Sequence, residues 1–328
     1  MPFSPSSDPW VVRASIALGT FVEVRLRSAE ATEARFAAAF AAIAHVHRRM
    51  NAHDNDSDLG RISRRGHHRA VAVDACTFDV LQTAQRLFRL SDGRFDVTCG
   101  PRRSRGGTFD AITLVAPRHV GTGRPVALDL GGIAKGYAVD RGIVALRNTG
   151  ATSGMVNAGG DLRVFGDAWT PLHLRDPRIP TKRLAVGEIR DVAVATSSDY
   201  FRSAPEILFE RGSARPRPYA SSITVVAPSC ALADALTKLV ALNWRRAAPL
   251  LSRLDAVAIR LTTDRHVLRS STTASRETDR LRFSTWPKPA DGNLATGGSR
   301  SCDNPPEAST DAKVIDLCAS RRCPSYHI

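Results

Sequence analysis

The sequence predicts an α+β fold, in which strands and helices are interspersed along the chain. The chain has 328 residues, of which 43% are hydrophobic and 24% charged, as expected for a globular protein with a sizeable core. Several short segments alternate apolar and polar residues, which is typical of half-buried strands. Alanine- and leucine-rich segments of helical length lie between them, without the regular strand–helix rhythm of a doubly wound parallel sheet.

The first 90 residues are expected to contain strands and two helices. Val22, Val24 and Leu26 alternate with charged residues, which predicts a strand with one buried face. An alanine-rich segment follows Ser28, which is a suitable N-cap residue for a helix. The strands expected in this part are within 10–27 and at 70–73, and the helices are at 29–49 and about 75–90. A polar loop at 51–58 and a short apolar turn at 59–62 separate them.

A connection rich in Gly, Pro and Arg follows, and further strands and helices come after it. The strands expected there are 127–130, 154–158, 161–165, 171–175, 191–195, 222–227 and 255–260, and the helices are 133–147, 230–241 and 244–253. From about residue 286 the composition shifts to Pro, Ser, Thr, Gly, Asn and Asp. We therefore predict one domain over 1–285 and a low-complexity, disordered tail over 286–328.

The charge of the chain favours an anionic partner. Lys and Arg number 46 against 32 Asp and Glu, a net charge of +14. Nucleic acid, a membrane surface and a phosphate ester are candidates, and arginines spread over solvated faces are the alternative. No apolar run approaches the ~20 residues of a membrane span. The first ten residues lack the features of a signal peptide and hold no cysteine for a lipid, so a cytoplasmic location is expected.

The motif with the clearest chemistry is Leu128-Asp-Leu-Gly-Gly-Ile-Ala-Lys-Gly-Tyr-Ala-Val-Asp140. Gly131 and Gly132 let the backbone approach a ligand closely, and free N–H groups at the start of the next helix attract a phosphate. Lys135 in the first helical turn opposes the helix dipole, which is tolerable if an anion lies there. A glycine turn packed between a strand and a helix is the alternative.

A possible metal site lies on the helix predicted over 230–241. Asp234, Thr237 and Lys238 share one face of it, at positions i, i+3 and i+4. Their neighbours are apolar, and a carboxylate in such surroundings needs a partner. Mg²⁺ held by a carboxylate, a hydroxyl and substrate phosphate oxygens is one candidate. An ion pair between Asp234 and Lys238 is the other. The histidines, including His45, have no metal-ligand spacing.

Three loops carry further candidate ligands. The glycine-bounded loop 91–101 contains Asp96, and ligand contacts often lie in such loops. The segment 157–161 ends in Asp161, and the segment 195–200 is rich in hydroxyl groups. Each of the three is also compatible with an ordinary turn.

Taken together and in order, these segments resemble the ApbE family of FAD:protein FMN transferases. The matching segments are 18–20, 50–62, 93–101, 129–140, 156–161, 195–200, 224–228 and 233–238. The resemblance implies a T-fold-like, two-layer α+β architecture with a flavin cleft between subdomains. It also implies an enzyme that uses Mg²⁺ to cleave FAD, transfers FMN to a Thr or Ser of a target protein, and releases AMP.

The resemblance further implies the residues that contact FAD. Carried over position by position, they are Leu18, His53, Arg94, Phe95, Asp96, Gly131, Gly132 and Lys135. Leu18 stands where the family has Met, and His53 stands where it has Tyr. The residues implied around the metal are Ala134 through its backbone, Asp234, Thr237 and Lys238. The family's companion hydroxyl lies at the position of Lys238, so Thr237 is the nearest hydroxyl.

The catalytic residues expected from the resemblance are Asp234, Lys135 and Asp96. Asp234 with Thr237 would hold Mg²⁺ across the diphosphate, and Lys135 would offset the charge that develops on the leaving group. The general base that receives the proton of the acceptor hydroxyl is either Asp96 or Asp161.

The chain departs from the family at residues 207–218, where the family carries His-Ile-Ile-Asp-Pro-Arg-Thr-Gly and this chain has no histidine. This departure motivates an alternative, a relative that binds or hydrolyses FAD without a protein acceptor. A basic nucleic-acid-binding module is a more distant alternative. Only 6% of the residues are aromatic and no stacking or groove-reading motif occurs, so no nucleic-acid partner is expected.

Overall fold

A computed structural model describes residues 8–98, 108–176, 179, 181–197, 221–262, 267–270 and 280–283. They belong to one compact unit formed by residues 1–291. Within the described ranges no helix is long and apolar enough to cross a membrane. The predicted tail 286–328 lies outside the described residues, so the division into a domain and a tail stays a prediction.

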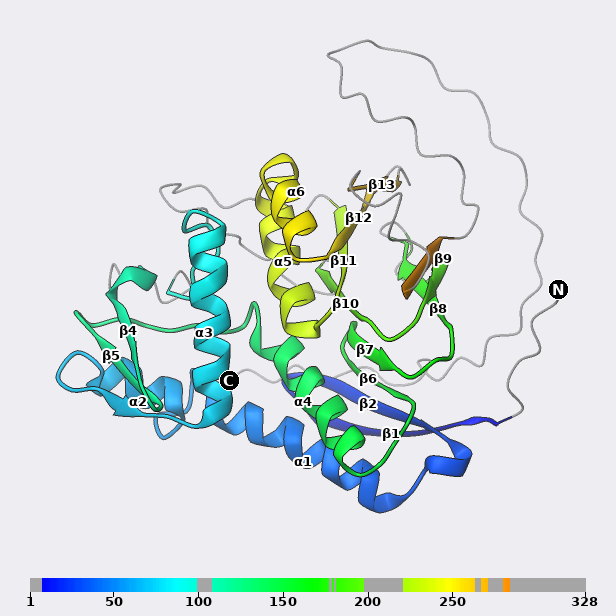
Figure 1. The fold of residues 1–328 in the computed structure, drawn as a ribbon, viewed down its shortest axis with the longest axis horizontal. Coiled ribbons are helices and arrows are strands. Elements are labelled where there is room, and N and C mark those ends of the chain that lie inside the picture. The colour runs from blue at the N-terminus through cyan, green and yellow to red at the C-terminus, as the bar shows by residue number, and fades with distance from the viewer. Residues whose placement is uncertain are drawn as a thin grey trace, which may run out of the picture. The chain divides into compact units, whose positions relative to one another are not determined.

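An eight-stranded antiparallel sheet lies at the centre of this unit, in the order β1-β2-β6-β7-β10-β11-β12-β13 (Figure 1). Its strands are β1 (Trp10–Ala17), β2 (Thr20–Arg27), β6 (Gly154–Ala158), β7 (Asp161–Phe165), β10 (Ala193–Ser197), β11 (Ser221–Ala227), β12 (Val257–Thr262) and β13 (Val267–Arg269). Val22, Val24 and Leu26 are fully buried along β2, which confirms the predicted alternation.

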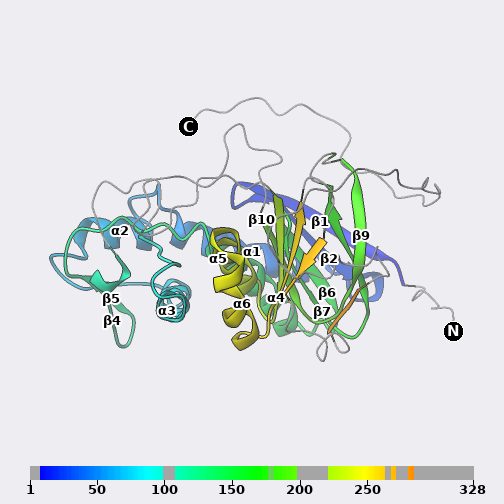
Figure 2. The same cartoon turned by 90° about the horizontal axis from the view of Figure 1, so that it is seen from above.

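Helices cover one face of this sheet, and a small sheet covers the other (Figure 2). The helices are α1 (Glu33–Met50), α4 (Ala134–Asn148), α5 (Cys230–Leu242) and α6 (Trp244–Arg253). The small sheet has the order β14 (Leu281–Phe283), β9 (Arg183–Ile189) and β8 (Thr170–Arg175). Leu172, Val186 and Ile189 of this sheet pack against Val194 and Val226 of the large sheet in a second core. The small sheet thus adds a third layer to the two layers that were predicted.

A further group of elements extends the helical side of the unit. It consists of α2 (Asp58–Arg65), α3 (Ala75–Leu90) and a sheet of β3 (Val71–Ala72), β5 (His119–Thr122) and β4 (Ile112–Val115). Its buried residues, among them Leu59 and Val120, belong to the same hydrophobic core as those of α1 and α4.

Some predicted elements were wrong in extent or kind. Helix α1 starts at Glu33 with Thr32 as its N-cap, because the Thr32 side chain accepts from the N–H of Arg35, whereas Ser28 opens a separate 3₁₀ turn. The apolar turn at 59–62 is part of helix α2. No strand forms at 127–130. The pattern also failed to predict β4 and β5, which have only four residues each, and β9, in which the consecutive buried residues Val186 and Gly187 interrupt the alternation.

Candidate functional site

The glycine-rich motif at 128–140 meets the helix that carries Asp234. Gly136 on α4 makes this possible, because a Cβ atom there would lie 2.2 Å from the carbonyl oxygen of Cys230 at the start of α5. Only a glycine lets the two helices approach this closely. The backbone N–H of Gly136 donates to Oδ2 of Asp234 at 3.2 Å. The two motifs that the sequence singled out separately therefore form one site.

Two lysines and two buried carboxylates make up the charged centre of this site. Lys135 Nζ forms an ion pair with Oδ2 of Asp161, which lies at the start of β7. Lys238 Nζ lies 3.0 Å from Oδ1 of Asp234 on the same helix. The side chains of Asp161 and Asp234 are 2% and 1% exposed. Buried charges need such partners, so each carboxylate is balanced by a lysine.

The groups of this centre shift one another's protonation. Burial raises the pKa of Asp161, as does the neighbouring charge of Asp234, and its pKa reaches about 6 although Lys135 and Lys238 oppose the shift. Burial lowers the pKa of Lys135, but the charges of Asp161 and Asp234 outweigh it, so its pKa lies above the ordinary value of 10.5. Lys135 is therefore protonated at neutral pH, whereas the pKa of Asp161 lies at about 6.

Hydroxyl groups complete the surroundings of Lys238. Its ammonium donates to Oγ of Ser197 at 2.8 Å and to Oγ1 of Thr237 at 3.1 Å. These two hydroxyl oxygens lie 2.7 Å apart, and Thr237 also donates to the backbone oxygen of Asp234 at 2.7 Å. Ser197 is the last residue of β10, so the sheet and helix α5 both contribute to this group. The sequence had marked the hydroxyl-rich segment 195–200 without singling out Ser197.

The glycine turn offers fewer free N–H groups than predicted. The N–H of Gly131 donates to Oδ1 of Asp129 at 2.8 Å. Those of Ile133 and Ala134 donate to the carbonyl oxygen of Leu130 at 2.9 and 2.8 Å. The expectation that free N–H groups of this turn hold a phosphate is therefore wrong at these three positions. The local turn satisfies them, and the lysine side chains supply the positive charge of the site.

Gly132 and Phe95, which were expected to contact FAD, lie beside this centre. A Cβ atom at Gly132 would lie 3.7 Å from Cε2 of Phe95 and 3.6 Å from Cγ of Lys238, so these side chains border the turn. Leu18 lies in the turn of the β1–β2 hairpin with a positive φ of 56°. Thr20, two residues after Leu18, packs against Gly159. A Cβ atom at Gly159 would lie 2.5 Å from the hydroxyl oxygen of Thr20. The hairpin thus abuts the glycine turn that precedes Asp161.

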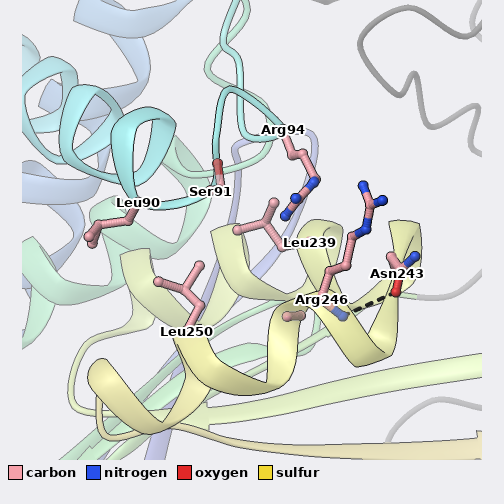
Figure 3. A pocket seen from close by; sticks show the side chains of 8 residues that line it. Leu90, Ser91, Arg94, Leu239, Asn243, Arg246 and Leu250 are labelled. Atoms are coloured by element: carbon pink, nitrogen blue, oxygen red, sulfur yellow. Dashed lines mark hydrogen bonds between the residues drawn. The ribbon is translucent and has the colours of Figure 1, made fainter.

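Arg94 lies in the loop after α3, beside the C-terminal end of α5. It lines a small pocket together with Leu239, Asn243 and Arg246, and its side chain descends from the loop while that of Arg246 rises from the helix below it (Figure 3). Arg94 also lies 3.4 Å from the carboxylate of Asp92 in its own loop. Two arginines at one opening attract an anion, so the prediction that Arg94 contacts FAD is compatible with this position.

Asp96 and His53 have local roles in the described structure. Oδ1 of Asp96 accepts from the N–H and the hydroxyl of Thr98 at 2.9 and 2.7 Å, and its other oxygen accepts from the N–H of Phe109 at 3.4 Å. Asp96 therefore holds its own loop. His53 is exposed in the loop after α1, where its N–H donates to Oδ1 of Asn51 at 2.9 Å.

Asp140, the last residue of the glycine-rich motif, has a role that the sequence did not predict. Its carboxylate accepts from the N–H groups of Cys230 and Ala231, both at 2.9 Å, and pairs with Arg163 at 2.6 Å. Asp140 thus caps the N-terminus of α5 from helix α4. Burial raises the pKa of Asp140, and these partners act against that shift. No signal in the sequence links residues 140 and 230.

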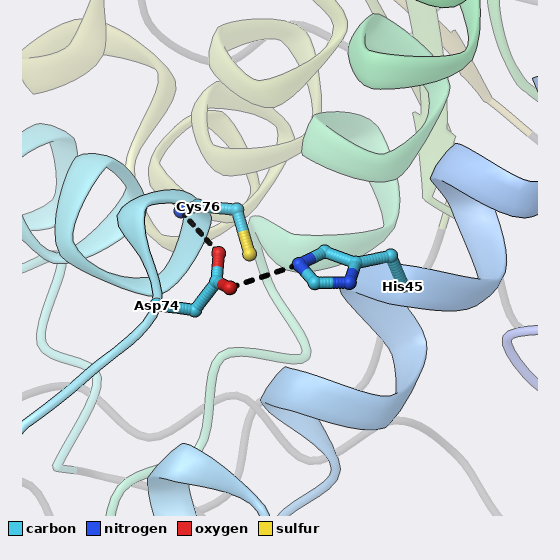
Figure 4. A group of neighbouring side chains, drawn as sticks. All are labelled: His45, Asp74 and Cys76. Carbon is cyan, nitrogen blue, oxygen red and sulfur yellow. Dashed lines mark hydrogen bonds and ion pairs between the residues drawn. The ribbon is translucent and has the colours of Figure 1, made fainter.

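A second cluster of possible ligands lies between α1 and α3 (Figure 4). His45 Nε2 is 3.0 Å from Oδ2 of Asp74, and the other oxygen of Asp74 accepts from the N–H of Cys76 at 3.0 Å. Arg49 lies 3.7 Å from the same carboxylate. Burial and the charge of Asp74 raise the pKa of the Cys76 thiol to about 12, so the thiol is protonated. The bonds of Asp74 cap helix α3, and the cluster is explained by that structural role.

Comparison with known proteins decides the relationship of this chain. The sequence profile of the ApbE family matches residues 18–260, which is most of the chain. The chain belongs to the ApbE family. Relatives named FAD:protein FMN transferase occur in Haemophilus influenzae (27% identity; 58% of this chain and 67% of the relative) and in Vibrio cholerae (29%; 58% and 68%). The solved structure of the flavin transferase ApbE from Vibrio cholerae has the same fold, with a TM-score of 0.69 and 23% identity over 80% of this chain and 96% of that one.

The ApbE resemblance also implied a magnesium site, and the residues present do not fit a divalent ion as they lie. Lys238 Nζ already occupies the space between Oδ1 of Asp234, Ser197 and Thr237 at 2.8–3.1 Å. These are hydrogen-bond distances, whereas Mg²⁺ requires oxygens at about 2.1 Å in an octahedral arrangement. This arrangement does not support the predicted use of Mg²⁺. The segment 207–218, with its missing histidine, lies outside the described residues.

Proposed function

We propose that this protein is an FAD:protein FMN transferase, which cleaves FAD and joins FMN to a hydroxyl of an acceptor protein. One observation supports the proposal most. In a chain of the ApbE family, two lysines and two buried carboxylates converge where the motif at 128–140 meets Asp234. Relatives carry the name of this activity. A pair of lysines suits a diphosphate, whose negative charge must be balanced during transfer.

In the proposed reaction, the acceptor hydroxyl oxygen attacks the phosphorus on the FMN side of the diphosphate. The new oxygen–phosphorus bond forms while the bond from that phosphorus to the bridging oxygen breaks. The bridging oxygen leaves with the electron pair as part of AMP. Lys135 and Lys238 offset the negative charge that grows on the phosphate oxygens and the leaving group. Phe95, which borders the glycine turn, would contact the flavin part of the substrate.

The proton of the acceptor hydroxyl needs a base, and Asp161 suits this role better than Asp96. A base works best when its pKa lies near the working pH, and the pKa of Asp161 is about 6. Asp161 also lies beside Lys135, whereas Asp96 uses its oxygens for Thr98 and Phe109. We therefore assign proton removal to Asp161.

A mass measurement tests the proposed function. The full-length chain is incubated with FAD and a panel of threonine- and serine-containing peptides, and both AMP and the peptide mass are followed. The proposal expects AMP release together with a peptide that has gained one FMN. Lys135→Met should reduce the rate by at least about 100-fold, since a charge that stabilises the transition state is lost. The exposed Lys182→Met serves as the control, with an expected rate equal to that of the wild type.

The second candidate function is FAD hydrolysis without a protein acceptor, which the missing histidine in 207–218 favours. In that case water replaces the acceptor hydroxyl, and the products are AMP and free FMN. AMP release with free FMN and no peptide adduct, across acceptors of varied sequence, would support this candidate. The absence of both AMP and an adduct would contradict both candidates.

A further inference from the structure

The position of Lys238 resembles that of an ion within its coordination shell. Its ammonium nitrogen has oxygens of Ser197, Asp234 and Thr237 at 2.8, 3.0 and 3.1 Å. One is a carboxylate oxygen and two are hydroxyl oxygens, which are the donor types expected around a hard cation. The oxygens come from the end of β10 and from one face of α5. The donor set inferred from the sequence for Mg²⁺ therefore surrounds an ammonium group.

The charges around this position leave no surplus for a divalent ion. Asp161 is balanced by Lys135, and Asp234 is balanced by Lys238. The neighbouring carboxylate of Asp140 is balanced by Arg163 and by two backbone N–H groups. A divalent cation added within about 3 Å of an ammonium group experiences strong repulsion, since screening is weak in a buried site.

The same ammonium lies close to where the substrate is expected. The stem of Lys238 passes the glycine turn, because a Cβ atom at Gly132 would lie 3.6 Å from its Cγ and 3.8 Å from its Cε. Its side chain is 18% exposed, whereas that of Asp234 is 1% exposed. The lysine therefore reaches the accessible side of the carboxylate, which is the side from which a diphosphate would approach.

We infer that Lys238 is the resident cation of this site, and that the protein binds and cleaves the diphosphate of FAD without a divalent metal ion. The inference rests on the proposed function. The Lys238 ammonium is paired with the Asp234 carboxylate and would also contact the phosphate oxygens of FAD. In the family this position between carboxylate and phosphate would belong to a metal ion. The bonds formed and broken are those of the proposed transfer, and no co-reactant is added.

Binding of FAD to the full-length chain tests the inference. Protein freed of metals with EDTA is titrated with FAD, and flavin fluorescence is measured with EDTA and then with excess Mg²⁺. The wild type should bind FAD with dissociation constants that agree within about twofold in the two buffers. It should also release AMP in EDTA. Binding that is about tenfold or more weaker in EDTA, and restored by Mg²⁺, would overturn the inference.

The variant Lys238→Thr makes the test specific, since it removes the ammonium and adds a hydroxyl beside Asp234. It should bind FAD about tenfold or more weakly than the wild type in EDTA, and Mg²⁺ should restore most of this loss. Lys182→Thr, at an exposed lysine between β8 and β9, is the matched control and should behave as the wild type. A Lys238→Thr variant that binds FAD as the wild type does in EDTA would contradict the role of the ammonium. If this variant does not fold, the wild-type comparison still decides.

A titration with Mn²⁺ separates this inference from the proposed function. If FAD does not bind in either buffer, the proposed function is contradicted. Mn²⁺ binding at Asp234 still tests whether the site holds a metal ion. Mn²⁺ is added to the protein, and the bound ion is measured by electron paramagnetic resonance. The wild type and Asp234→Asn should bind the same amount of Mn²⁺, because Asp234 holds no metal ion. A bound ion that disappears in Asp234→Asn would show that the carboxylate holds a metal despite Lys238, and would overturn the inference.

Discussion

At the scale of single residues, the site depends on carboxylates whose surroundings differ. Asp96 accepts three hydrogen bonds from Thr98 and Phe109, and Asp161 is buried beside two lysines and Asp234. The sequence offered both as bases with nothing to separate them. Their protonation depends on burial and on charges from distant parts of the chain, which a local motif does not contain.

The pKa of Asp161 predicts a pH dependence of FMN transfer. If ionised Asp161 takes the proton, the rate should rise about tenfold per pH unit below pH 6 and level off above it. Asp161→Asn should reduce the rate and remove the bend near pH 6. Asp96→Asn should keep the change of slope near pH 6. If this change of slope disappears in Asp96→Asn instead, Asp96 and not Asp161 is the base. The profile is measured from AMP release in overlapping buffers.

The same shift has an effect of known sign on stability. The pKa of Asp161 is raised from 3.8 to about 6, so the folded state binds this proton more tightly than the unfolded chain does. The contribution of Asp161 to the free energy of unfolding should therefore decrease as the pH rises from about 4 to 6. Chemical unfolding of the wild type and Asp161→Asn across this range should reveal a difference in slope. Equal slopes would contradict the shift.

At the scale of elements, α4 and α5 are joined by a side-chain cap and a close crossing. Most predicted helices and strands were confirmed, and β6, β7, α3 and α6 match their predicted bounds. Their hydrophobic periodicity is local, so the sequence contains it. The pairing of α4 with α5 is not local, because it depends on the meeting of Gly136 with Cys230 and of Asp140 with the start of α5.

Removing the Asp140 cap should destabilise the protein. Asp140→Ala leaves the N–H groups of Cys230 and Ala231 without this acceptor and Arg163 without this carboxylate. The expected loss is about 3–5 kcal/mol, which is typical when one partner of a buried ion pair is removed. Asp191→Asn neutralises one partner of the exposed pair with Arg147, keeps a side chain that tolerates the positive φ of 43° there, and should cost less than about 1 kcal/mol. Urea unfolding of both variants measures the difference, and equal losses would contradict the capping role.

Adding a methyl group at the helix crossing should also be costly. In Gly136→Ala the new Cβ would lie 2.2 Å from the backbone oxygen of Cys230, which cannot move as a side chain does. Separating the helices should lower the free energy of unfolding by about 1–3 kcal/mol or more. It should also weaken FAD binding, because Gly136 donates to Asp234. Gly123→Ala is the steric control, because its φ is not positive and the nearest atom to the added Cβ, the carbonyl oxygen of Ala111, lies 4.0 Å away. A Gly136→Ala variant as stable as the wild type would contradict the close contact of α4 and α5 at Gly136.

At the scale of the compact unit, the site lies where several layers meet. The large sheet contributes Asp161 and Ser197, and helices α4 and α5 contribute Lys135, Asp234 and Lys238. A ligand that contacts all of them should hold these elements together and stabilise the fold. The binding free energy then adds to the free energy of unfolding.

FAD should therefore raise the melting temperature. At a concentration about 100 times its dissociation constant, a ligand adds about 2.7 kcal/mol to the stability. For a chain of this size that corresponds to roughly 4 °C. Riboflavin lacks the diphosphate and should produce a much smaller shift, because the lysines would have no anion to bind. Differential scanning fluorimetry or circular dichroism measures both, and equal shifts for the two compounds would contradict a site that recognises the diphosphate.

The sequence by itself determined the mixed fold, most element boundaries and the family, because periodicity, capping residues and ordered motifs are properties of neighbouring positions. It also identified Lys135, Asp234 and Lys238 as candidates. Only the tertiary structure decided how they are used. It paired Lys135 with Asp161, surrounded the Lys238 ammonium with oxygens from two elements, and occupied the N–H groups of the glycine turn. Burial and charge act through space, and the chain folds residues about 100 positions apart into one site.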